Sequence, residues 1–117
     1  IYSARWAQKY GNFSKAGKKI LELIKKKNRS KKIKNLKAKF ICSLTLCYNK
    51  TKLVTTIGII KGKISESLLG KNGFGYDPIF IPEGSKKTFG QISKKKKMGI
   101  DHRYLAFKKM KRKINIL

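Results

Sequence analysis

Residues 70–80, which read GKNGFGYDPIF, contain the residue types best suited to hold a flat ligand. Gly73 and Gly75 flank Phe74, and glycine permits backbone conformations and close approaches that a side chain prevents. Phe74 and Tyr76 offer apolar ring faces, on which a nucleic-acid base can stack with a gain of about 1–3 kcal/mol. Composition alone favours a plainer interpretation, in which this is a glycine-rich turn with its aromatic rings anchored in the core.

Asp77, which follows these rings, is one of only five acidic residues in the chain. It precedes Pro78, and a residue before proline avoids the α region, so we expect an extended backbone at Asp77.

A second segment, residues 94–103 (KKKKMGIDHR), supplies hydrogen-bond donors. The N–H groups of Lys97, His102 and Arg103 suit keto oxygens or phosphates. They could converge on one ligand if a short connection places Lys97 beside the start of the final helix. Taken alone, the lysine run is more typical of a solvated face, and a lone histidine is more often structural.

Apolar spacing predicts that final helix over residues 100–114. Asp101 lies at its N-cap position, where the carboxylate can accept from the first free N–H groups. His102 and Arg103 then fall in the first turn, where the helix dipole disfavours a cation by about 0.3–1 kcal/mol. Such breaks of local helix rules are expected at functional sites. The residues expected on one apolar side are Leu105, Ala106, Met110 and Ile114.

A second helix is predicted near the start of the chain. Residues 13–27 carry apolar residues at helical spacing, and Asn12 or Ser14 could cap them. Residues 28–37 are polar and basic, which predicts a loop.

The middle of the chain predicts a β-hairpin. Residues 38–48 and 53–64 are rich in β-branched and aromatic residues, as in paired strands. Gly58 and Gly62 within the second strand indicate a bulge or a close approach of another backbone. Residues 79–81 predict a short third strand.

The charge balance is extreme, with 31 Lys and Arg against 5 Asp and Glu and a formal net charge of +26. Such a balance can indicate a polyanionic partner such as RNA or DNA. The basic residues, however, are nearly all lysine, whereas nucleic-acid recognition favours arginine. Lys, Ile and Asn also share A/T-rich codons. Compositional drift therefore explains the charge better, and we do not expect nucleic acid as the partner.

Cysteine usage and hydropathy indicate a cytoplasmic protein. Cys42 and Cys47 lie five residues apart in one predicted strand, about 16 Å at 3.3 Å per residue, beyond the reach of a disulfide. One histidine and two cysteines do not complete a zinc site. No run approaches the roughly 18 apolar residues of a membrane span, so no membrane partner is expected.

The ordered set of motifs is more specific than any one of them. YSARWA, FICSLTL, GIIKGKI, GFGYDPIFIPEGSKKTFGQ and KxxxxHR follow one another between Tyr2 and about Met110. This set resembles the inosine/xanthosine triphosphate pyrophosphatases, which remove non-standard purine nucleoside triphosphates. The resemblance implies an α/β fold, a mixed β-sheet with flanking helices in two lobes and the substrate between them, usually in a homodimer.

The resemblance also implies a substrate-binding role for residues in both segments described first. In the family, the aromatic ring stacks on the purine, and the HR pair helps to select the 6-keto form. A 6-keto purine presents an acceptor where adenine presents a donor, and each buried donor left unpaired costs about 1–3 kcal/mol. The substrate-binding residues so implied are Phe74, Gly75, Tyr76, Asp77, Lys97, His102 and Arg103.

The family reaction converts ITP, dITP or XTP to the nucleoside monophosphate and pyrophosphate with Mg²⁺. Its catalytic acids and triphosphate-gripping segment lie upstream of the position of Ile1. We therefore expect residues 1–117 to be the carboxy-terminal portion of one such domain, without the phosphate- and metal-binding part. No catalytic residue is expected here, and the chain alone should be inactive, with an exposed sheet edge and one poorly covered sheet face.

Two alternatives stay open. A basic RNA- or DNA-binding module would use the lysine faces together with Phe74 and Tyr76 as stacking platforms. A non-catalytic remnant of the family would keep the fold and lose the reaction.

Overall fold

The computed structural model describes residues 3–28 and 35–116 and has the α/β architecture that the sequence predicted. The predicted helices and strands are present within one or two residues of their expected bounds. Two short helices near the start of the chain and before the last helix were not predicted. In chain order the elements are α1 (Ser3–Tyr10), α2 (Phe13–Lys27), β1 (Lys37–Tyr48), β2 (Lys52–Ile64), a 3-10 turn η1 (Asp77–Ile79), β3 (Phe80–Pro82), α3 (Lys94–Met98) and α4 (His102–Ile116).

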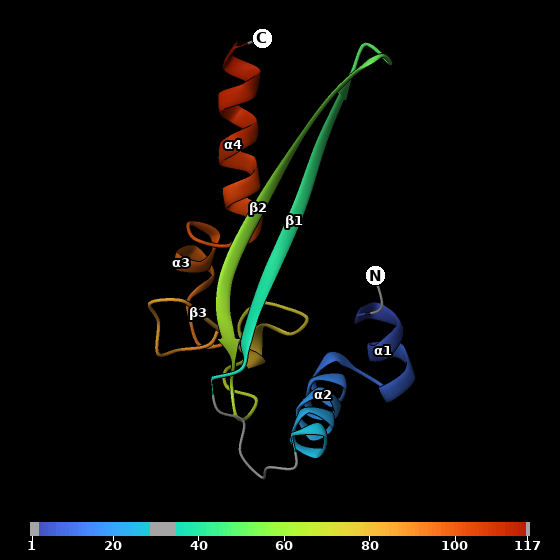
Figure 1. Ribbon diagram of the computed structural model, residues 1–117, viewed down its shortest axis with the longest axis vertical. Coiled ribbons are helices and arrows are strands. Elements are labelled where there is room, and N and C mark those ends of the chain that lie inside the picture. The colour runs from blue at the N-terminus through green and yellow to red at the C-terminus, as the bar shows by residue number, and fades with distance from the viewer. Residues whose placement is uncertain (1–2, 29–34, 117) are drawn as a thin grey trace.

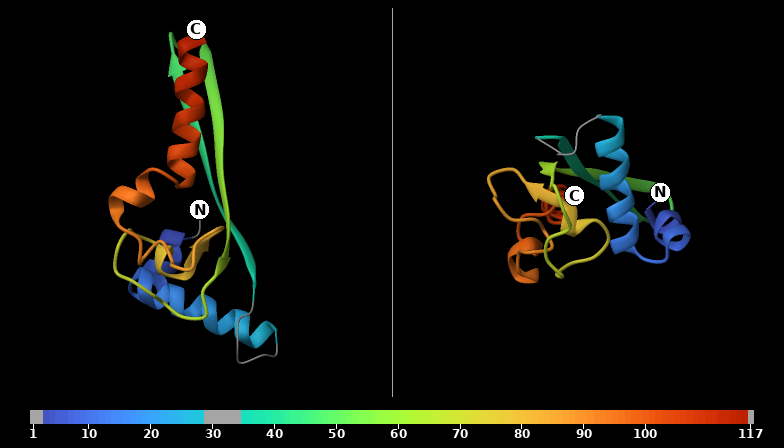
Figure 2. Two further views of the ribbon diagram at one scale, coloured as in Figure 1. Left: turned by 90° about the vertical axis from the view of Figure 1, so that its left-hand side faces the viewer. Right: turned by 90° about the horizontal axis from the view of Figure 1, so that it is seen from below.

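A long hairpin dominates the structure (Figure 1). β1 and β2 pair antiparallel without interruption from Lys37–Lys63 to Tyr48–Lys52, and β3 pairs antiparallel with the lower end of β2. α4 lies alongside the upper part of the hairpin, and α1 and α2 form a pair near its lower end (Figure 2). The unbroken register rules out a bulge in the hairpin, so its glycines serve another purpose.

Gly58 and Gly62 are places where other backbone comes too close for a side chain. A Cβ at Gly58 would collide with the His102 carbonyl oxygen and the Ala106 amide nitrogen at the start of α4. A Cβ at Gly62 would collide with the carbonyl oxygen of Ile81 in β3. The prediction of a close backbone approach is therefore confirmed at both glycines.

Side chains alternate between the two faces of the hairpin. One face packs against other parts of the protein, and the other is exposed. The covered face packs on α4 and on the core formed by Phe80, Phe89 and Ile92, which Phe40 and Ile60 join from the strands. On the other face, every residue from Lys37 to Cys47 in β1 and from Leu53 to Lys63 in β2 is exposed. Within the described residues, one sheet face is thus bare, as expected.

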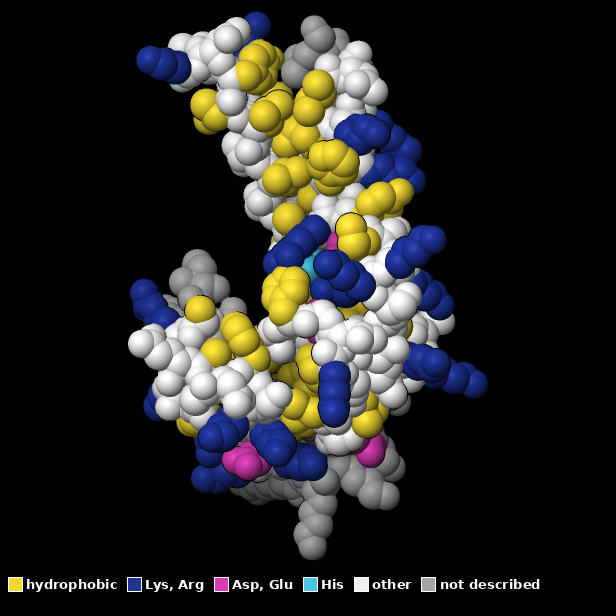
Figure 3. All heavy atoms as spheres, turned by 180° about the vertical axis from the view of Figure 1, so that it is seen from behind, with side chains coloured by type: hydrophobic (Ala, Val, Ile, Leu, Met, Phe, Trp, Pro, Cys, Tyr) yellow, Lys and Arg dark blue, Asp and Glu magenta, His cyan; other side chains and the backbone are white. Residues whose placement is uncertain are grey.

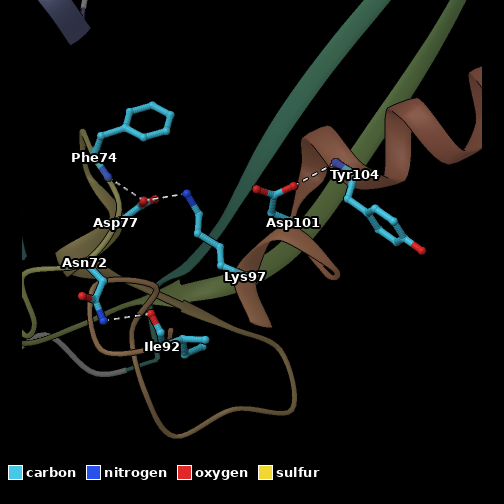
Figure 4. Close-up of polar contacts among 7 residues, drawn as sticks. All are labelled: Asn72, Phe74, Asp77, Ile92, Lys97, Asp101 and Tyr104. Carbon is cyan, nitrogen blue, oxygen red and sulfur yellow. Dashed lines mark hydrogen bonds and ion pairs between the residues drawn. The ribbon is translucent and has the colours of Figure 1, made fainter. Parts of the chain in front are cut away.

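The caps of the two long helices follow local rules. Asn12, and not Ser14, caps α2, since its Oδ1 accepts from the Lys15 N–H at 2.8 Å. Asp101 caps α4 by accepting from the Tyr104 N–H at 2.8 Å (Figure 4).

One expected core residue of α4 is not buried. Ala106 and Met110 are buried, but Ile114 is 41% exposed. Each four-residue step turns about 40° beyond a full turn, so Ile114 has rotated away from the strands.

Cys42 and Cys47 are free thiols, as predicted. Among the described residues, no helix has the length and apolar character needed to cross a membrane.

Candidate functional site

The glycine-aromatic loop is organised by the buried carboxylate of Asp77. Its Oδ2 accepts from the Phe74 N–H at 2.9 Å and from the Lys97 ammonium at 2.7 Å (Figure 4). Gly73 lies so close that a Cβ there would collide with this same oxygen, and its φ of +73° also favours glycine. One carboxylate oxygen thus fixes the loop and holds a cation beside it.

The expectation of an extended backbone at Asp77 was wrong. Asp77 begins the 3-10 turn η1, with the Phe80 N–H directed back to the Asp77 carbonyl oxygen. The Gly90 N–H also donates to this carbonyl at 3.1 Å. Tertiary hydrogen bonds therefore override the local preference of a residue before proline.

The two aromatic residues of the loop have different environments. The ring of Tyr76 is half-buried and meets Phe13 of α2 edge-on, with 5.7 Å between centroids. Burial raises the pKa of the Tyr76 hydroxyl. Phe74, by contrast, is 56% exposed. The core-anchored interpretation thus holds for Tyr76 and fails for Phe74, whose ring is accessible to a ligand.

Two cations lie over the Phe74 ring. The Lys97 ammonium is 4.8 Å and the Arg103 guanidinium carbon 4.4 Å from the ring centroid, within the range of cation–π attraction. Lys97 belongs to α3, a single turn that Ser93 caps by accepting from the Lys96 N–H at 3.3 Å. The solvated-face interpretation therefore holds for the first three lysines of the run, which are exposed, and fails for the buried Lys97.

His102 stands beside Arg103 at the first position of α4. Its ring lies 5.1 Å from the Phe40 ring, and its Nδ1 is buried without a hydrogen-bond partner. Burial lowers the pKa of His102; Asp101 opposes this shift, and Arg103 and Lys97 add to it. The imidazole is therefore neutral at pH 7. A buried polar atom without a partner calls for an explanation, and a ligand that supplies the partner is one.

The structure brings together all but one of the candidate side chains. Hydrogen bonds and cation–π contacts link Phe74, Asp77, Lys97 and Arg103, and His102 adjoins Arg103 on the helix. On the face shown in Figure 3, the histidine lies among lysine and arginine side chains, where the surface is hollowed between the hairpin arm and the lower part of the molecule. The side chain of Tyr76 instead packs toward α2.

Sequence reasoning overlooked residues that hold the loop in place. The Asn72 side-chain amide donates to the Ile92 carbonyl oxygen at 3.1 Å (Figure 4). The Thr88 hydroxyl, fully buried, donates to the Leu69 carbonyl oxygen at 2.6 Å. The available signal was an asparagine directly before Gly73 and a threonine inside the downstream motif.

The chemistry of this arrangement suits a flat, acceptor-rich ligand. Phe74 offers a ring that is more than half exposed, and Lys97 and Arg103 hold their donors over that ring. In the described part of the chain, no group of three or more His, Cys, Asp or Glu residues could hold a metal ion. The described residues of the candidate site thus offer an aromatic ring and hydrogen-bond donors, and not a cluster of metal ligands.

The model of the Ham1 family matches residues 1–113. This chain belongs to the Ham1 family. The resemblance read from the motifs is confirmed by curated relatives that are named dITP/XTP pyrophosphatase. The one from Clostridium tetani is 37% identical over 114 residues, covering 97% of this chain and 54% of the relative. The one from Clostridium perfringens is 40% identical over 111 residues, covering 95% and 52%.

Solved structures agree with the fold. A HAM1 protein from Coxiella burnetii superposes with a TM-score of 0.85 at 27% identity, over 99% of this chain and 58% of that protein. The Ham1 protein of Staphylococcus aureus superposes with a TM-score of 0.76 at 27% identity, over 89% and 51%. The chain therefore spans about half the length of the family members that it matches.

Proposed function

We propose that this chain forms the base-binding side of a nucleoside triphosphate pyrophosphatase. The enzyme hydrolyses non-standard purine nucleoside triphosphates (ITP, dITP and XTP) to the nucleoside monophosphate and pyrophosphate, and so cleanses the nucleotide pool. The observation that carries the proposal is the exposed Phe74 ring with the Lys97 and Arg103 cations at 4.8 and 4.4 Å from its centroid. The names of the relatives support the substrate class.

In this proposal, the purine stacks on Phe74. The base competes with the Arg103 guanidinium for the ring, and the displaced guanidinium, with Lys97 and the neutral His102, faces the edge of the base. Gly75 has a φ of +63° and nothing within 4 Å of a Cβ, so it shapes the loop without crowding the ligand. A 6-keto oxygen accepts from these donors, whereas an adenine amino group leaves them unpaired at about 1–3 kcal/mol each.

In this proposal, Asp77 and Tyr76 position the loop and its neighbouring cation and do not contact the base. The Asp77 carboxylate is already shared between the Phe74 N–H and the Lys97 ammonium, so Asp77 acts by positioning both. Tyr76 anchors the loop against α2 through Phe13. These two residues therefore set the geometry that the ligand meets.

Family members are about twice as long as the part that this chain matches. The catalytic step is assigned to the remaining part of their sequence. Mg²⁺ is the expected cofactor of the complete enzyme, but the described residues do not fit a magnesium site, because the carboxylate of Asp77 is paired with Lys97 and no acidic cluster is present among them. The proposal therefore derives no step through a metal, and this chain alone does not hydrolyse the substrate. The proposal also holds that the complete enzyme is a homodimer and that it acts in the cytoplasm.

The decisive experiment is a titration of the chain with inosine monophosphate and adenosine monophosphate by calorimetry. Phe74→Leu should weaken inosine monophosphate binding roughly 5- to 150-fold, the equivalent of about 1–3 kcal/mol of lost stacking. The matched control is Phe107→Leu, since Phe107 is 54% exposed on α4. It should change the affinity less than twofold.

Two results would contradict the proposal. One is equal weakening by both substitutions. The other is binding without preference for inosine, together with tight binding of arbitrary RNA, which would favour the nucleic-acid alternative.

A further inference from the structure

The bare face of the hairpin carries four lysines in a block, here called the lysine quartet: Lys37, Lys39, Lys61 and Lys63. Lys37 is paired in register with Lys63, and Lys39 with Lys61. Residues directly opposite each other have Cβ atoms about 4.5–5.5 Å apart, and neighbours on the same strand face are about 6.6 Å apart. The register therefore places the four lysine Cβ atoms within a patch of roughly 5 by 7 Å.

Such a block works against the hairpin unless something neutralises it. Like charges directly opposite each other on a sheet destabilise the pairing. Among the described residues, ion pairs join Lys19 to Glu22 and Lys97 to Asp77, so no quartet lysine has a carboxylate within ion-pair distance. The repulsion is therefore unrelieved by the described part of the chain.

The quartet also lines a hollow of about 830 Å³. β3 and the turn after it supply the rest of the wall, including Ile81, Gly84 and Ser85. Glu83 is the one acidic residue in the lining. Basic side chains around a concave surface concentrate anions there.

We infer that the lysine quartet binds a linear oligophosphate, such as pyrophosphate or tripolyphosphate. Among the described residues, the charge block has a boundary along the strands and another toward β3. Along the strands it ends at Ile41 and Ile59, which are exposed and apolar, and toward β3 it ends at Glu83. A nucleic-acid backbone that ran along the strands past the quartet would cross these isoleucines, whereas an anion of two or three phosphoryl groups fits within the block.

This site is separate from the base-binding site and does not rest on the proposed function. His102 packs against Phe40 on the covered face of the sheet, and the quartet occupies the opposite face. A nucleotide stacked on Phe74 therefore cannot place its phosphates on the quartet through the sheet.

The test is a calorimetric titration of the chain with tripolyphosphate at low ionic strength. Lys39→Gln combined with Lys61→Gln removes one cross-strand pair of charges and should weaken binding at least roughly 10-fold, because two charge-assisted contacts to the anion are lost. The matched control combines Lys18→Gln with Lys26→Gln, two exposed lysines of α2. It should change the affinity less than twofold.

A second measurement does not depend on the variants. In the unsubstituted chain, tripolyphosphate should shift the amide resonances of the quartet and of Gly84 and Ser85 before any others. Equal weakening in both double variants, resonance shifts spread over all lysines, no measurable binding, or tighter binding of single-stranded RNA than of tripolyphosphate would each overturn the inference.

Discussion

The two faces of the hairpin differ in what covers them. On the covered face, Gly58 admits the backbone of α4, and the Thr56 hydroxyl donates to the Ala106 carbonyl oxygen at 2.8 Å. These contacts set the start of α4, and with it His102 and Arg103. On the bare face, the same strands carry lysines and isoleucines that no described residue covers. The candidate site is thus positioned by small residues that allow close approach, and not by the abundant charge.

Lysine itself shows the same contrast. Lys97 is buried, paired with Asp77 and placed over an aromatic ring, whereas the quartet lysines are exposed and unpaired among the described residues. In a chain with a formal net charge of +26, the residue type therefore carries little information, and the surroundings of each lysine carry nearly all of it.

Of the changes considered, Gly58→Ala should lower the stability of the chain most, because it disturbs the covered face of the hairpin. The added Cβ meets backbone atoms of His102 and Ala106, which cannot move without lifting α4 from the strands. We expect the free energy of unfolding to fall by about 3 kcal/mol, the upper end for overpacking, when measured by urea denaturation. Gly99→Ala is the control, because its nearest atom outside its chain neighbours would be 3.6 Å away. Equal effects of the two changes would show that Gly58 does not set the position of α4.

A smaller change in the free energy of unfolding is expected when the pH is lowered, because His102 lies on the covered face. Burial lowers the pKa of His102 below its ordinary value of about 6.5, so the unfolded chain binds its proton more readily than the folded chain. The contribution of His102 to stability is therefore present above pH 6.5 and is lost as the pH falls through this value toward the folded-state pKa.

Urea denaturation between pH 7.5 and 5.5 checks this expectation. The free energy of unfolding should fall with pH in the unsubstituted chain, and His102→Gln should remove that part of the slope. An unchanged slope in the variant would assign the pH dependence to other groups.

Local patterns were sufficient to predict the long elements. Apolar spacing and the caps Asn12 and Asp101 gave α2 and α4, and β-branched runs gave the hairpin. α3 was missed because a run of four lysines has no apolar period; its turn depends on the Ser93 cap and on the burial of Lys97 beside Asp77.

The site itself was predicted as a set of residues, but their individual surroundings were not. Phe74 and Tyr76 flank the same glycine and look equivalent in the sequence. They are distinguished by Phe13, more than sixty residues away, which packs against Tyr76 and leaves Phe74 open. Asp77 likewise adopts a 3-10 turn, and not the predicted extended backbone, because a distant donor, the Gly90 N–H, binds its carbonyl oxygen. Tertiary partners decided both points, and no local rule contains them.

The smallest change in stability is expected at Ile59, and Ile60 beside it on the opposite face provides the comparison. Ile59, on the bare face, is 43% exposed, whereas Ile60 packs into the core with Phe80 and Phe89. Ile59→Thr should change the free energy of unfolding by less than about 0.5 kcal/mol, as at other exposed positions, and Ile60→Thr should cost about 2 kcal/mol because it buries a hydroxyl in an apolar site. Both are measured by urea denaturation at several protein concentrations. A loss above about 1 kcal/mol for Ile59→Thr, growing with concentration, would mean that another copy of the chain covers this face in solution.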